Sequence, residues 1–112
     1  MGDRANVILK SGDEQVCLYT HWCGHELPQI VKNGLIRGKS RWHDFQYLTR
    51  IIFCEMIKDD VLGKTGFGIS QKKHDGRKVL KIDCDNTTMS VNGDEPISLA
   101  SYVNIDEPGW GS

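Results

Sequence analysis

Hydrophobic and polar residues alternate through the first part of the chain in the manner of strands. The stretch ANVILK (5–10) predicts one strand, and QVCLYTHW (15–22) predicts a second that is rich in β-branched and aromatic residues. Between them, SGDE (11–14) carries Gly12 and Asp13, residues typical of tight turns. The pattern therefore predicts a β-hairpin.

After the hairpin the hydrophobic period lengthens to that of a helix. The positions with this spacing are Leu27, Ile30, Val31 and Leu35. Pro28 suits the first turn, where its missing N–H costs nothing, and Gly38 suits the end of the helix.

A second helix is predicted in FQYLTRIIFCEMIK (45–58), with Asp44 as its N-cap. One apolar stripe consists of Phe45, Leu48, Ile52 and Met56. Ile51 and Phe53 widen the stripe until the middle of the helix is apolar almost all round. Such a helix lies between layers or against another subunit, and we expect a homo-oligomer.

Beyond residue 65 the hydrophobic period returns to two, as in strands. The segments with this pattern are GFGIS (66–70), VLKIDCD (79–85) and TMSVNG (88–93). Asp75-Gly76 is a hairpin signal inside a charged turn, and ISLASYV (97–103) suits a short helix or strand. We expect one α+β domain over residues 1–112, with a mostly antiparallel sheet of about five strands in the order ββααβββ and two helices packed on one face.

Composition limits the possible environment and partners. The chain has 112 residues, 26% charged, and a net charge of −1. No apolar run approaches the ~18 residues that span a bilayer, and the N-terminus lacks the pattern of a signal peptide. We expect a cytoplasmic protein with reduced thiols, no membrane association and no general nucleic-acid binding.

Charge is unevenly distributed along the chain. Residues 32–81 contain twelve Lys or Arg and five Asp or Glu, whereas residues 82–112 contain six acidic residues and no basic one. Either the basic middle attracts an anion or acidic partner, or the acidic end folds back and neutralises it.

The run VCLYTHWCGH (16–25) raises the question of a metal site. Strand periodicity places Val16, Leu18, Thr20 and Trp22 on the core side, and Cys17, Tyr19, His21, Cys23 and His25 on the other. Six residues of strand span about 20 Å, too far for Cys17 and Cys23 to share one ion. The chain also lacks the paired spacings of zinc sites. We expect no metal and no cofactor.

Catalysis is the weaker of the functional hypotheses. A His21/His25 pair could act as acid and base on a phosphodiester, because general acid–base catalysis at neutral pH commonly uses histidine. The stretch GKTGFGIS (63–70) lacks the earlier glycine of a phosphate-binding P-loop and leads into a strand. We therefore expect no nucleoside-triphosphate hydrolysis.

A binding surface explains the same residues better. Aromatic rings stack on flat bases, while Arg and Lys meet phosphates. The candidate ligand-binding residues are Tyr19, His21, Trp22, His25, Arg41, Trp42, Arg50 and Phe67. Structural alternatives remain open: Trp42 as a staple at the entry of the second helix, Arg50 paired with Asp44 or Glu26, and Phe67 in the core.

Three segments together resemble a family of small, mostly uncharacterised proteins of phages, prophages and prokaryotes. The family pattern is LYxHWxGxELP, then RWxDxxYLxRIIF, then G[YF]GIS. Here it matches residues 18–28, 41–53 and 66–70, and the resemblance extends over about residues 14 to 92. The pattern has a small residue where this chain has Cys23. The resemblance implies the same α+β domain and names no activity.

These observations lead to a functional expectation. We expect a non-enzymatic binding protein for a small anionic, nucleotide-like ligand, acting as a phage-type antagonist that sequesters a host defence signal. Two alternatives are a protein–protein inhibitor of a host factor and a small hydrolase that uses His21 and His25.

Overall fold

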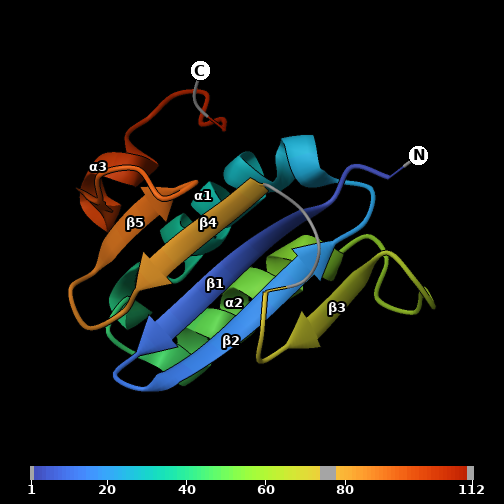
Figure 1. The fold of residues 1–112 in the computed structure, drawn as a ribbon, viewed down its shortest axis with the longest axis horizontal. Helices are drawn as coiled ribbons and strands as arrows, with labels where there is room; N and C mark the ends of the chain where they lie inside the picture. Colours follow the sequence, from blue (N-terminus) through green and yellow to red (C-terminus); the bar gives the residue numbers. More distant parts are fainter. Residues whose placement is uncertain (1, 74–77, 111–112) are drawn as a thin grey trace.

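A six-stranded sheet backed by two helices forms the fold, in a computed structural model that describes residues 2–73 and 78–110 (Figure 1). The strands are β1 (Ala5–Ser11), β2 (Glu14–Thr20), β3 (Phe67–Ser70), β4 (Lys78–Asp83), β5 (Thr88–Val91) and β6 (Ile97–Ser98). The helices are α1 (Leu27–Arg37), α2 (Phe45–Ile57) and α3 (Leu99–Val103), with single 3₁₀ turns η1 (Gly24–Glu26) and η2 (Lys39–Arg41).

The predicted α+β fold is confirmed, with one strand more than expected. The sheet order is β3-β2-β1-β4-β5-β6, and every pair is antiparallel except β1 with β4. The segment 97–103 is both strand and helix, because β6 leads directly into α3. The Asp75-Gly76 hairpin signal lies outside the described residues.

The predicted hairpin between β1 and β2 has the expected turn. Ser11 pairs with Glu14, and Gly12 adopts a φ of +59° in the left-handed region that favours glycine. Asp85, just beyond β4, accepts hydrogen bonds from Ser11 Oγ at 2.8 Å and from the Gly12 N–H at 2.7 Å. The turn is thereby fixed to the neighbouring strand.

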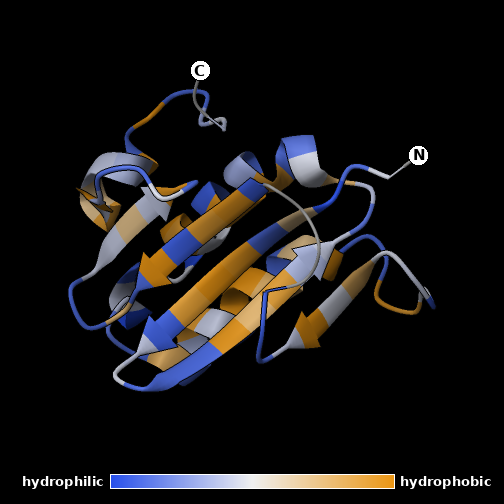
Figure 2. Cartoon of the chain, viewed as in Figure 1, coloured by the Kyte–Doolittle hydropathy of each residue, from blue (hydrophilic) through white to orange (hydrophobic). Residues whose placement is uncertain are grey.

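The hydrophobic core lies between the sheet and the two long helices. Alternation along β1 turns Ala5, Val7 and Leu9 towards the helices, where all three are fully buried. In Figure 2 the hydrophobic positions are concentrated along the middle of β1, β2 and β4, and the connecting loops are mostly hydrophilic. Burial of this sheet face against α1 and α2 supplies most of the apolar stabilisation.

Two assignments along β2 require correction. The strand ends at Thr20, so the alternation stops there, and Trp22 is 56% exposed rather than in the core. Cys17, predicted in an exposed or interface-facing row on the face away from the core, is instead fully buried, with its Sγ 3.1 Å from Asn6 Oδ1. Leu18 and Thr20 are buried as expected.

The two helices pack closely and share a buried charge. A Cβ on Gly34 of α1 would lie 3.1 Å from Ile52 Cγ1 of α2, so the glycine permits the close approach. Glu55 of α2 is 5% exposed and binds Arg37 of α1 and Lys58, each at 2.8 Å.

The second helix, α2, is only partly covered within the single chain. Asp44 caps it by accepting a hydrogen bond from the Tyr47 N–H, as predicted. Ile51 and Phe53 are half-buried within the single chain, and the homo-oligomer therefore stays a prediction. Within the described ranges, none of the helices combines the length and the apolar character required to cross a bilayer.

Candidate functional site

The largest hollow that contains predicted binding residues lies at the end of the sheet where β2 finishes and β3 begins. It has a volume of about 670 Å³, and we call it the Trp22 cleft. Its walls are the segment 22–26, one side of α1, the end of α2 with the three residues after it, the start of β3, and residues 107–108. Parts of the chain from both ends therefore meet in this site.

Trp22 is held at the mouth of the cleft by the bend that ends β2. Thr20 Oγ1 accepts a hydrogen bond from the Cys23 N–H at 3.1 Å, and the His21 N–H donates to the Gly66 carbonyl at 2.9 Å. Gly66 has a φ of +105°, and a Cβ there would lie 3.2 Å from Trp22 Cδ1. The glycine thus makes room for the indole against the backbone.

His25 is oriented by Asp3, at the start of the chain. Asp3 Oδ2 accepts the His25 backbone N–H and also lies 2.8 Å from Nδ1, while Oδ1 accepts Lys78 Nζ at 2.8 Å. The hydrogen bond from Lys78 and then those from His25 lower the pKa of Asp3 to about 2. The ionised carboxylate can only accept, so Nδ1 carries the proton and Nε2 is directed away from Asp3.

The C-terminal segment closes one side of the cleft. Trp110 Nε1 donates to the Gly24 carbonyl at 2.8 Å, and Lys32 Nζ donates to the Ile105 carbonyl at 2.6 Å. Between these two attachments, Glu107 and Pro108 reach the cleft. No sequence pattern predicts this wall, because residues 106–112 have the composition of a polar tail.

The charge of the cleft is strongly negative. Its carboxylates are Glu26, Glu55, Asp59, Asp60 and Glu107, whereas Lys58 is its one lysine. Burial, and then the neighbouring charge of Glu26, raise the pKa of the Cys23 thiol. The thiol is therefore protonated at neutral pH and unsuited to act as a nucleophile.

Five of the eight predicted binding residues lie in or beside the cleft. Trp22, His25 and Phe67 line it. The His21 ring lies beside the rings of Tyr19 and Trp22, with 5.9 Å between the ring centroids in each pair. Tyr19 lies across Gly68 of β3, where a Cβ would collide with its ring.

The other three predicted residues lie elsewhere and do not join this group. Arg41 is 3.7 Å from Asp44 and lies over the Tyr47 ring at 4.9 Å. Trp42 packs against the core, and its Nε1 donates to the Leu35 carbonyl at 2.9 Å. That carbonyl belongs to the last turn of α1, which has no partner within the helix, so Trp42 caps α1.

Arg50 lies on the exposed side of α2. With Arg37 and Lys58 it lines a hollow of about 280 Å³, which we call the α2 hollow. Neither Asp44 nor Glu26 pairs with Arg50, and no other ion pair of Arg50 occurs in residues 2–73 and 78–110.

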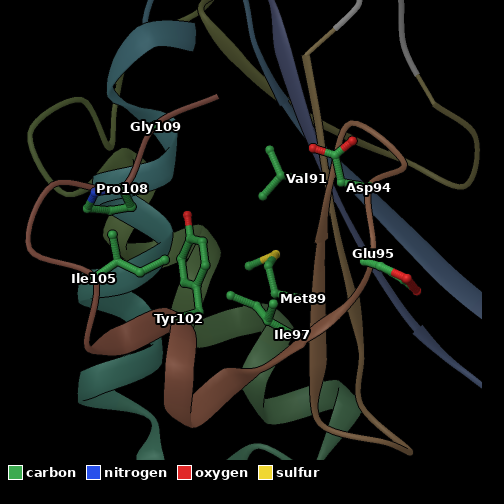
Figure 3. Close-up of a pocket in the computed structure, with 9 residues that line it drawn as sticks. All are labelled: Met89, Val91, Asp94, Glu95, Ile97, Tyr102, Ile105, Pro108 and Gly109. Carbon is green, nitrogen blue, oxygen red and sulfur yellow. The ribbon is translucent and has the colours of Figure 1, made fainter. Parts of the chain in front are cut away.

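A more apolar pocket shares Pro108 with the Trp22 cleft (Figure 3). It has a volume of about 320 Å³ between β5, α3 and the segment 105–109. Met89, Val91 and Tyr102 face into it, and the Tyr102 hydroxyl donates to the buried Pro28 carbonyl at 3.2 Å. It contains none of the predicted binding residues.

The cleft residues that sequence reasoning missed are Asp3, Asp59, Asp60, Glu107 and Trp110. Their roles depend on contacts between distant parts of the chain, which no local pattern records. In the described part of the chain, no three His, Cys, Asp or Glu side chains form a group that could hold a metal ion. Comparisons with protein-family models, curated proteins and solved structures found no match to this chain.

Because the pKa of Asp3 is lowered, we expect the protein to lose part of its stability in acid. The stabilisation of the fold by ionised Asp3 is complete above the ordinary pKa of 3.8 and is lost as pH falls through about 2. Asp3→Asn should lower the free energy of unfolding at pH 7 by about 1–2 kcal/mol and reduce its dependence on pH between 4 and 2. Urea denaturation across this range measures both effects. Asp13→Asn, in the exposed hairpin turn, is the control, and equal pH dependence in the two variants would contradict the prediction.

Because Trp42 caps α1, we expect its substitution to lower stability and to leave binding unchanged. Trp42→Phe keeps a ring in place but leaves the Leu35 carbonyl without its donor, and should cost about 1 kcal/mol in the free energy of unfolding. The matched substitution Trp22→Phe, at an exposed ring, should change stability little. If urea midpoints show no difference between Trp42→Phe and the unaltered protein, the capping role is wrong.

Proposed function

We propose that this chain is a non-enzymatic binding protein that holds a partner protein at the Trp22 cleft. The observation that carries the proposal is an exposed tryptophan at the mouth of a cleft of about 670 Å³. Tryptophan is enriched among residues that dominate protein interfaces, because it combines a large apolar area with few rotatable bonds.

Two exposed apolar residues follow one wall of the cleft in the sequence. Val61 and Leu62 follow the cleft residue Asp60 directly and are 63% and 93% exposed. Neighbouring exposed apolar side chains on a small protein are characteristic of an interaction surface. In a phage-type setting, such a protein acts by occluding a host factor, which is the protein–protein inhibitor considered from the sequence.

Hydrolysis of a phosphodiester fits the cleft less well. His25 is oriented by Asp3 in the manner of a general base, which favours acid–base chemistry. However, the five carboxylates would repel an anionic substrate, and the protonated Cys23 thiol supplies no nucleophile. Binding is therefore the better explanation of the same residues.

Affinity capture with matched variants tests the proposal. The unaltered protein and Ile36→Ser, which removes a side chain 52% exposed on α1, should retain the same stoichiometric protein from a lysate of the cell in which it acts. Trp22→Ser should retain at least tenfold less of it, because the anchor is lost. Equal retention by all three proteins would remove the Trp22 cleft as the interface.

A second candidate function, supported by a different observation, is binding of a small anionic, nucleotide-like ligand at the α2 hollow. Arg37, Arg50 and Lys58 face the hollow with Glu55 as its one carboxylate. Since Glu55 pairs with Arg37 and Lys58, Arg50 is the cation that is left to meet a phosphate. Such a protein would act by sequestering a nucleotide signal.

Thermal unfolding with a panel of nucleotides and cyclic nucleotides tests this second candidate. A ligand present at 100 times its Kd should stabilise the fold by about 2.7 kcal/mol. Arg50→Gln should reduce that shift, whereas Lys64→Gln, with the same charge change in an exposed loop, should preserve it. A flat response across the panel would exclude anion binding of this kind.

A further inference from the structure

We infer that the Trp22 cleft receives a cationic side chain of the partner protein, an arginine in preference to a lysine, with its guanidinium against the Trp22 ring. The inference rests on the proposed function and adds the chemistry of the partner. It also reverses the sign of charge that the sequence led us to expect of a ligand at these aromatic residues.

Negative charge in the cleft is the first observation behind this inference. Five carboxylates face one lysine, and Glu55 is already paired with Arg37 and Lys58. For the other four carboxylates, no ion pair forms with any residue in the described ranges. Their field is concentrated by the walls of the cleft, so it attracts a cation and repels a phosphate.

The exposed aromatic ring is a second, independent observation. Trp22 is 56% exposed at the mouth, with Phe67 in the wall beside it. Indole is the side chain whose face attracts cations most strongly. A planar guanidinium stacks on such a ring and still donates hydrogen bonds to carboxylates at its edge, whereas an ammonium ion is compact and strongly hydrated.

Among residues 2–73 and 78–110, no arginine lines the cleft. Arg37 is bound to Glu55 on the outer side of the helices, and Arg41 lies beside Asp44 and Tyr47. Neither they nor Arg50 line the cleft. The aromatic and acidic groups are therefore left for a cation from another molecule.

Nuclear magnetic resonance of the full chain provides the test, because its three indole N–H groups have different environments. The Trp42 indole, which donates to the Leu35 carbonyl and does not line the cleft, serves as the internal reference. Acetyl-Arg-Leu-amide should shift the Trp22 indole signal at millimolar concentration and leave the Trp42 signal unchanged. Acetyl-citrulline-Leu-amide, which has the same shape without the charge, should bind at least tenfold more weakly, and acetyl-Lys-Leu-amide should fall between them.

Charge-neutralising variants distinguish an effect of the cleft carboxylates from an effect of the protein's net charge. Asp59→Asn combined with Asp60→Asn should weaken the arginine probe at least fivefold. The control pair Asp13→Asn and Asp94→Asn changes the net charge equally, at exposed sites away from the cleft, and should bind normally. Asp60 makes main-chain hydrogen bonds with Ile57 and Gly63, and the amide substitution leaves these in place.

The outcomes distinguish this inference from the proposed function. Equal shifts of Trp22 with the arginine and citrulline probes would overturn the charge preference and leave the cleft as a binding site for a partner protein. No shift of Trp22 with any probe would overturn the inference, while the capture experiment with Trp22→Ser decides the proposed function separately. Equal weakening by the two double variants would show that only the net charge of the protein matters, which also overturns it.

Discussion

The parallel pairing of β1 with β4 is the contact on which the arrangement of the whole molecule depends. It sets Ala5 beside Lys78 and joins the N-terminal hairpin to the C-terminal strands in one sheet. A parallel pair needs a long connection, and here that connection contains β2, both long helices and β3. Because Lys78 then lies next to the start of β1, its amine reaches Asp3, and Asp3 in turn fixes His25.

Local patterns in the sequence were sufficient to predict most elements but not their assembly. Hydrophobic period, the Asp44 cap and the Gly12 turn depend on neighbouring residues, and they predicted the hairpin and both helices. The end of β2 at Thr20 was missed because the bend after it depends on a hydrogen bond to Gly66, far along the chain. Trp22 was therefore assigned to the wrong environment by an alternation that no longer applied.

The predicted binding residues fall into separate groups in the structure, again because contacts between distant parts of the chain decide where they lie. Tyr19, His21, Trp22, His25 and Phe67 meet because β3 pairs with β2. Arg41 and Trp42 lie next to one another in sequence, but one is paired at the start of α2 and the other caps α1. The count of charges along the chain grouped the arginines with the aromatic residues. Folding instead brings carboxylates from three separate segments to those aromatic residues.

The hydrogen bond from the Trp110 indole to the Gly24 carbonyl determines when the cleft can form during synthesis of the chain. During synthesis, β1, β2, both long helices and β3 are all made before residues 107–110 are added. A nascent chain that stops short of these residues has Trp22 and the acidic residues Glu55, Asp59 and Asp60 but lacks one wall of the cleft. The cleft is therefore completed late, after the scaffold that supports it, and a partner meets the finished site only on chains whose synthesis has passed this point.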